Sequence, residues 1–176
     1  MASGESAKIP VGEPVYRDPQ HVIAVYQNTI LTYSGDAPSP QYLDSWTRTV
    51  EQVAARFPTE LLALTIIDRH VRAPDDNART RVRNAVLRHA DSIRAFAYVV
   101  EGEGFGAAAV RSAVSLISMA ARYPFPQKVF GQVEAAVPWL LSCTPQRAGE
   151  RALDAGKLVE IARSLRGQLH DSAATG

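Results

Sequence analysis

The stretch from Ile93 to Arg122, IRAFAYVVEGEGFGAAAVRSAVSLISMAAR, decides the fold. It opens with a short apolar run at 93–100, which is typical of a strand that is covered on both faces of a sheet. The glycine-rich segment EGEGFG at 101–106 breaks this run, and residues 107–122 then follow a helical period. A buried strand, a glycine turn and a helix in this order indicate an α/β protein.

Similar elements are predicted on both sides of this unit. The β-rich runs around Gln27-Asn28-Thr29 indicate a hairpin, and Val15-Tyr16 is a candidate edge strand. Ser39 and Pro40 have the residue types of a helix cap and of a first helical position. The other expected elements are a buried strand at 61–67, a helix from about 75, a short strand at 128–130, a helix at 133–141 and a last helix from Thr144-Pro145 to about Gln168.

We therefore predict an α/β fold with a mixed, mainly parallel sheet of four to five strands and an extra C-terminal helix. Residues 1–12 are expected to form a disordered tail and residues 13–142 one domain. Residues 143–170 are expected to form a helix that packs on this domain or lies in a partner interface. The helix at 107–122 is rich in small apolar residues, so we expect it to pack closely.

The bulk composition excludes several classes of partner. The chain has 176 residues, 46% of them hydrophobic and 21% charged, and its net charge of +1 gives no global field for nucleic acid or an acidic membrane. Cys143 is the one cysteine, so no intramolecular disulfide can form. We see no signal-peptide core and no apolar run of membrane-spanning length, and we expect a cytoplasmic protein.

The last third of the chain carries a recognisable pattern. A strand, a helix, a short KVF strand and an acidic helix that ends in Trp-Leu resemble the STAS-like family, of the anti-sigma-factor-antagonist type. The matching positions are Lys128, Val129, Phe130, Glu134, Ala136, Trp139 and Leu140. The resemblance covers residues 20–142 and implies a non-enzymatic domain of bacterial-type signalling that binds partner proteins.

The family's regulated hydroxyl is a serine at the start of the helix after the second buried strand. The corresponding place here is Pro74-Asp75-Asp76-Asn77, and no serine or threonine follows until Thr80. Two interpretations of Asp75 and Asp76 stay open: they imitate a phosphorylated serine, or they are acids that stabilise a helix N-terminus.

The glycine turn poses an enzymatic alternative. The spacing of Gly102, Gly104 and Ala107 fits a permissive dinucleotide fingerprint between a strand and a helix. Glu101 and Glu103, however, would bring negative charge to a pyrophosphate. We favour a structural turn in which the glycines supply positive φ.

A group of arginines surrounds the helix expected after residue 74. We select as candidate partner-binding residues Arg69, Arg72, Asp75, Asp76, Arg79 and Arg83. Three interpretations remain: a solvated surface, a site for an acidic protein, or a nucleic-acid or lipid site, which is disfavoured because no aromatic residue interleaves the arginines.

No constellation of catalytic or metal-binding residues stands out. His21, His70, His89 and His170 fall in four different elements, so we expect no metal and no cofactor. An Asp68–His70 pair at a strand end is conceivable as a catalytic pair, but a loop histidine is the preferred interpretation.

The leading functional hypothesis is a non-enzymatic regulatory or scaffolding module that acts by protein–protein interaction. Its expected surfaces are the region 69–88 and the C-terminal helix, and its partner is another protein, with an acidic protein and a second copy of the chain both open. The first alternative is a small-molecule or lipid sensor or carrier, in which the sheet and the apolar helix at 107–119 line a pocket. The second is a nucleotide-binding enzyme that uses the turn from Gly102 to Ala107.

Overall fold

The computed structural model describes residues 13–71, 74–144 and 153–170. The predicted tail at 1–12, Arg72 and the predicted helix start at Pro145 lie outside the described residues.

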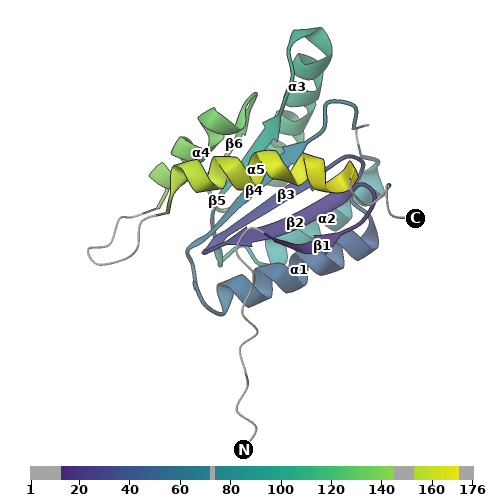
Figure 1. Ribbon diagram of the computed structural model, residues 1–176. Helices are drawn as coiled ribbons and strands as arrows, with labels where there is room; N and C mark the ends of the chain where they lie inside the picture. The colour runs from purple at the N-terminus through teal and green to yellow at the C-terminus, as the bar shows by residue number, and fades with distance from the viewer. Residues whose placement is uncertain (1–12, 72–73, 145–152, 171–176) are drawn as a thin grey trace, which may run out of the picture.

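The protein has an α/β fold built on one mixed sheet of six strands (Figure 1). The strands lie side by side in chain order: β1 (Pro14–Arg17), β2 (His21–Tyr26), β3 (Thr29–Ser34), β4 (Leu61–Ile67), β5 (Ile93–Val100) and β6 (Gln127–Phe130). β1, β2 and β3 pair antiparallel, whereas β3, β4, β5 and β6 pair parallel. The described residues thus contain more strands than the four or five expected, because both Val15-Tyr16 and the short segment at 127–130 are paired edge strands.

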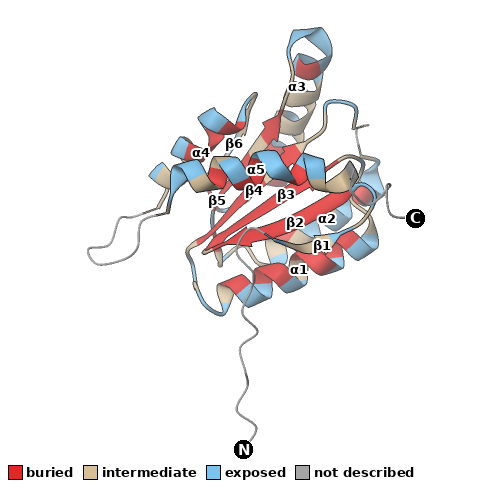
Figure 2. Ribbon diagram, in the orientation of Figure 1, coloured by how far each residue is buried: buried red, intermediate tan, exposed pale blue. Residues whose placement is uncertain are grey.

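Helices cover both faces of the sheet. They are α1 (Pro40–Ala54), α2 (Asp76–Arg88), α3 (Gly104–Ala121), α4 (Val133–Ser142) and α5 (Ala155–His170). One core cluster joins the sheet to α4 and α5, and a second joins the opposite face to α1 and α2. Figure 2 shows the strands as the buried layer between these helices.

Alternation along the strands assigns each side chain to one of the two cores. In β4, Leu62, Leu64 and Ile66 pack in the α4–α5 core, whereas Leu61 and Ala63 pack in the α1–α2 core. Side chains on a strand point alternately to opposite faces, so a strand that is covered on both faces must be apolar at nearly every position. The buried strands predicted at 61–67 and 93–100 are confirmed.

Local signals fix the start of α1 as the sequence predicts. The Ser39 side chain accepts a hydrogen bond from the backbone N–H of Tyr42 at 3.1 Å, and Pro40 is the first helical residue. The apolar stripe of the helix, which includes Trp46 and Val50, is buried against the sheet. The predicted hairpin is also confirmed, with Gln27 at a φ of 54° in its turn.

The helix α3 departs from expectation in two ways. It begins at Gly104 rather than at Ala107, two residues after the positive-φ residue Gly102. Of its eighteen residues only Ala107, Ser118 and Ala121 are buried, so the expectation of close packing was wrong. The helix rests against β5 and β6, and its N-terminal part projects beyond the sheet (Figure 1).

The composition of α3 is unusual for a helix with so much exposed surface. The expectation that no segment reaches membrane-spanning length was wrong here, because α3 is long enough and apolar enough by length and composition alone, with a mean hydropathy of 1.4. Only 17% of this window is buried. Phe105 and Met119 are 93% and 73% exposed, respectively.

Candidate functional site: an apolar cavity between α2 and α3

A cavity of about 510 Å³ lies between α3 and the α1–α2 pair. β4 and β5 form its floor, through Thr65, Ile67, Phe96 and Tyr98. The helices supply the walls, chiefly through apolar side chains: Tyr42, Leu43 and Trp46 of α1, Val82 and Val86 of α2, and Val110, Ala113, Val114 and Ile117 of α3. Its volume falls in the range of about 300–1,000 Å³ that is typical of small-molecule sites.

Aromatic rings form much of the cavity floor. The rings of Phe96 and Tyr98 stack with centroids 4.5 Å apart and an interplanar angle of 10°. Tyr98 is one of the few polar groups here, and Ser118 of α3 hydrogen-bonds to its hydroxyl. Burial is the main cause that raises the pKa of Tyr98 above its ordinary value, so this hydroxyl stays neutral.

Two of the tyrosine hydroxyls at the cavity, those of Tyr42 and Tyr98, already have partners within the protein. The Tyr42 hydroxyl hydrogen-bonds to Thr32 and Ser34. Among the described residues, the buried side-chain atoms without a partner belong to Thr29, His89, Gln127, Thr144 and Gln168, and none of these residues lines the cavity. The cavity interior therefore offers mainly hydrocarbon contacts to a ligand.

The charges at the cavity lie on exposed side chains. Arg79 and Arg83 of α2 line it, one helical turn apart, and both are exposed. Asp36, in the loop after β3, is the one acidic residue among the described lining residues. The cavity thus combines an apolar interior with a cationic edge.

The structure separates the six predicted partner-binding residues. Arg79 and Arg83 lie at the cavity, whereas Arg69 packs against the backbone at Gly102, where an added Cβ would lie 3.2 Å from its Cδ. Asp75 caps α2 by accepting a hydrogen bond from the Ala78 N–H at 2.7 Å, and Asp76 lies 3.3 Å from Arg79. Arg72, the sixth, lies outside the described residues.

The turn around Gly102 binds the side chain of Arg111, which belongs to α3. The Arg111 guanidinium donates hydrogen bonds to the carbonyls of Val100 and Gly102, at 3.1 and 3.0 Å. Gly102 and Gly104 have φ values of 114° and 85°, a region that side chains rarely adopt. Arg111 thereby ties α3 to the end of β5 at the turn that fits a dinucleotide fingerprint in the sequence.

Asp68 and His70 do not form a catalytic pair in this arrangement. Asp68 accepts hydrogen bonds from the Tyr33 hydroxyl at 2.6 Å and from the backbone N–H of His70 at 2.8 Å. The His70 ring instead accepts a hydrogen bond from Arg69 Nε at 3.1 Å. Burial alone would raise the pKa of Asp68, but these hydrogen bonds and the charge of Arg166 outweigh it, so this pKa lies below its usual range.

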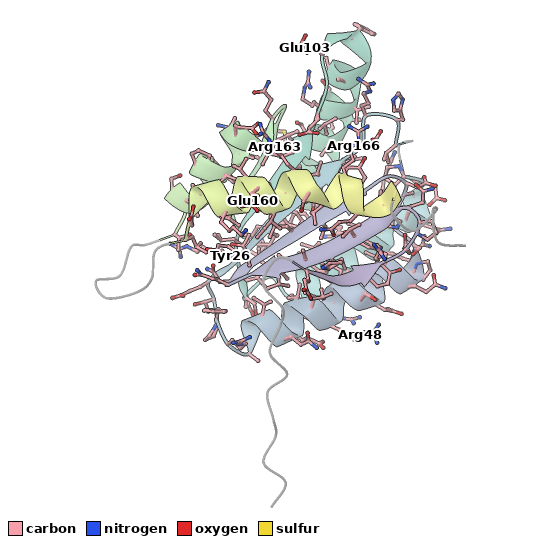
Figure 3. All side chains as sticks on the ribbon, in the orientation of Figure 1. Tyr26, Arg48, Glu103, Glu160, Arg163 and Arg166 are labelled. Carbon is pink, nitrogen blue, oxygen red and sulfur yellow. The ribbon has the colours of Figure 1, made fainter. Side chains whose placement is uncertain are left out.

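The C-terminal helix α5 packs on the sheet face opposite the cavity. Leu158, Ile161, Ala162 and Leu165 are buried in the α4–α5 core. Its polar side pairs with neighbouring elements, Arg163 with Glu134 of α4 and Arg166 with Asp68. Figure 3 labels the two arginines on α5. The sequence also allows this helix to lie in a partner interface. Such an interface would need an exposed apolar stripe, and the described residues of α5 have no large exposed apolar side chain.

Metal and thiol chemistry find little support in the described part of the chain. No group of three or more His, Cys, Asp or Glu side chains within it could hold a metal ion. Cys143 is partly buried and packs against the α4–α5 core.

The cavity residues on the sheet and on α1 are not recognisable in the sequence, because Trp46, Phe96 and Tyr98 resemble ordinary core residues there. One signal points toward the site. The helix α3 is apolar on nearly all sides, which is typical of a helix with two apolar neighbours rather than one. Here one side of α3 faces the cavity and another faces outward.

Comparison of the chain with protein-family models, with curated proteins and with solved structures gave no match.

Proposed function

We propose that the protein is a non-enzymatic binding module that holds an apolar small molecule in the cavity between α2 and α3. This is the sensor or carrier of the sequence-based alternatives. The observation that supports it is the cavity of about 510 Å³, with mostly apolar walls and with the hydroxyls of Tyr98 and Tyr42 already hydrogen-bonded within the protein. Such a cavity favours a hydrocarbon ligand, because burying each methylene contributes about 0.8 kcal/mol.

A matched pair of tryptophan substitutions on α3 tests this proposal. Ala113 lines the cavity, whereas Ala109, one turn earlier, is exposed and does not line it. We expect Ala113→Trp to fill the cavity and to abolish binding of a neutral solvatochromic dye such as Nile red. Ala109→Trp should bind the dye as the wild type does.

Two outcomes would contradict the proposal. In the first, the dye fails to bind the wild-type protein at any concentration below its solubility limit. In the second, Ala113→Trp and Ala109→Trp bind it equally. Thermal melts of both variants would show that the loss of binding is not a loss of folding.

A second candidate function is self-association through α3, which keeps the protein-interaction hypothesis in a specific form. The outward stripe contains Phe105, Ala108, Ala109, Ser112 and Met119, all exposed and none charged. An uncharged stripe can face its own copy across a twofold axis without like-charge repulsion. We expect Phe105→Glu with Met119→Glu to convert a dimer to a monomer in light scattering; a wild-type chain that stays monomeric at millimolar concentration would reject this candidate.

We further propose that the fold is STAS-like and that its sheet is of the mainly parallel kind expected for that family. The element order and the three parallel pairings from β3 to β6 support this proposal. Membership of this family would imply a regulatory role in the cytoplasm. Isolation of a partner protein that binds the chain would test this role.

A further inference from the structure

We infer that the ligand is a single-chain anionic amphiphile, whose hydrocarbon chain fills the cavity and whose head group lies against Arg83 and Arg79. This inference rests on the proposed function and narrows it from any apolar molecule to one chemical class. It also gives two of the predicted partner-binding arginines a common role at one site.

The interior determines the tail of the ligand. Tyr98 and Tyr42, whose hydroxyls are the phenolic groups on the floor and the α1 wall, are already hydrogen-bonded within the protein. A polar group placed between Phe96 and the α3 wall would lose its hydration without gaining a partner. The buried part of the ligand must therefore be hydrocarbon, and the volume of about 510 Å³ suits one chain better than two.

The edge determines the head group. In the described residues no carboxylate forms an ion pair with Arg83. Burial raises the pKa of Tyr123 to about 12, and the nearby positive charge of Arg83 offsets part of this rise. Arg79 contacts Asp76, whose side chain is 99% exposed, and so exposed a pair is weak enough for a ligand to replace. Two exposed guanidinium groups one turn apart match the oxygens of a carboxylate or a phosphate.

Asp36 sets a limit on where the anion can lie. It is the single acid among the described lining residues, so the cavity edge carries two cations and one anion. A carboxylate beside Asp36 would be repelled, whereas the charged residues of α2 that line the cavity are the cations Arg79 and Arg83, with Asp76 outside the lining. The head group is therefore placed at α2 and the tail between α3 and the sheet.

The experiment compares amphiphiles that share one chain and differ in the head group. Dodecanoate, dodecyl phosphate and dodecyltrimethylammonium, each below its micelle concentration, and dodecanol, below its solubility limit, would displace Nile red from the wild-type protein. We expect the two anions to bind about tenfold more tightly than dodecanol, as one charge-assisted hydrogen bond allows, and the cation to bind most weakly. The ratio of dodecanoate to dodecyl phosphate shows whether the site prefers a carboxylate or a phosphate.

Arginine variants locate the head group. Arg83→Gln combined with Arg79→Gln should reduce the preference for dodecanoate over dodecanol to about one, while dodecanol binds as before. Arg81 and Arg88 are exposed on the same helix and do not line the cavity, so Arg81→Gln with Arg88→Gln is the matched control and should keep the preference.

The possible results distinguish the anionic head group from the apolar cavity itself. Equal binding of dodecanoate and dodecanol by the wild type would overturn the anionic head group and leave the apolar cavity standing. An unchanged preference in the Arg79–Arg83 variant would also overturn it. No displacement by any of the four compounds would overturn both.

Discussion

At the scale of single residues, Asp68 connects three elements that are distant in the chain. It accepts hydrogen bonds from Tyr33 of β3 and from the backbone of His70, and Arg166 of α5 lies 3.4 Å away. The Tyr33 side chain is buried, so its hydroxyl depends on this carboxylate. A position that the sequence suggests as half of a catalytic pair thus acts as a structural anchor between the sheet and α5.

We expect Asp68→Ala to lower the free energy of unfolding by about 1–3 kcal/mol, because it leaves the buried Tyr33 hydroxyl without an acceptor. Urea unfolding, followed by circular dichroism, measures this loss. Asp91→Ala is the matched control, since Asp91 is exposed. Equal stability of the two variants would show that the anchor contributes nothing.

Acid should weaken the same contacts. The pKa values of Asp68 and Asp18 are lowered in the folded protein: burial alone would raise both, but the hydrogen bonds from Tyr33 and Tyr16, respectively, together with backbone N–H donors and neighbouring positive charge, outweigh it. Groups with a lowered folded pKa stabilise the protein above their unfolded pKa of about 3.9, and this stabilisation is lost as the pH falls through the folded pKa.

We therefore expect the stability difference between the wild type and Asp68→Asn to be constant from pH 7 to about 5 and to shrink below pH 4. Urea midpoints, measured at half-unit steps of pH, test this. A difference that persists unchanged to pH 2 would contradict the role of the ionised carboxylate.

At the scale of elements, the start of α2 distinguishes the two acids that the resemblance highlights. Asp75 caps the helix through the Ala78 N–H, whereas the Asp76 side chain is almost fully exposed. Asp75→Ala should cost about 1 kcal/mol of stability and Asp76→Ala clearly less, as measured by chemical unfolding. If Asp76→Ala cost more, the assignment of Asp75 as the cap would be wrong.

Local chemistry explains which elements the sequence predicts well. Ser39 before Pro40, and Asp75 before an arginine-rich helix, are cap signals that act over four residues, so they appear directly in the sequence. The buried strands are equally clear, because coverage on both faces requires an apolar residue at almost every position. The two edge strands are short and partly exposed, which explains why fewer strands were expected.

The position of α3 could not be predicted in the same way. The sequence leaves open whether its apolar residues pack closely or line a pocket, because nothing local distinguishes a helix that packs on a sheet from one that borders a cavity. The difference arises because α2 and α3 stand apart over Phe96 and Tyr98, and the distance between two helices is a property of the tertiary structure. The same holds for Arg79 and Arg83, whose place at the cavity edge depends on that gap.

At the scale of the whole molecule, the two sheet faces have different characters. The face under α4 and α5 is a filled core, whereas the face under α1 and α2 opens into the cavity beside α3. Because the cavity has a limited volume, it should accept alkyl chains only up to a certain length. We expect affinity for n-alkanoates to rise about fourfold per methylene and then to level off, by isothermal titration calorimetry. A rise that continues to the longest soluble chain would indicate nonspecific adsorption instead.

The two tryptophans provide the most direct test of the central claim that the cavity holds a hydrocarbon chain. Trp46 lines the cavity, whereas Trp139 packs against Phe130 beside the α4–α5 core, with ring centroids 5.5 Å apart. Bromine quenches indole fluorescence only on close approach, so 12-bromododecanoate can be read separately in Trp139→Phe, which keeps Trp46, and in Trp46→Phe, which keeps Trp139. We predict saturable quenching of Trp46 with one ligand per chain and little quenching of Trp139; equal quenching of both, or none of Trp46, would contradict the proposed site.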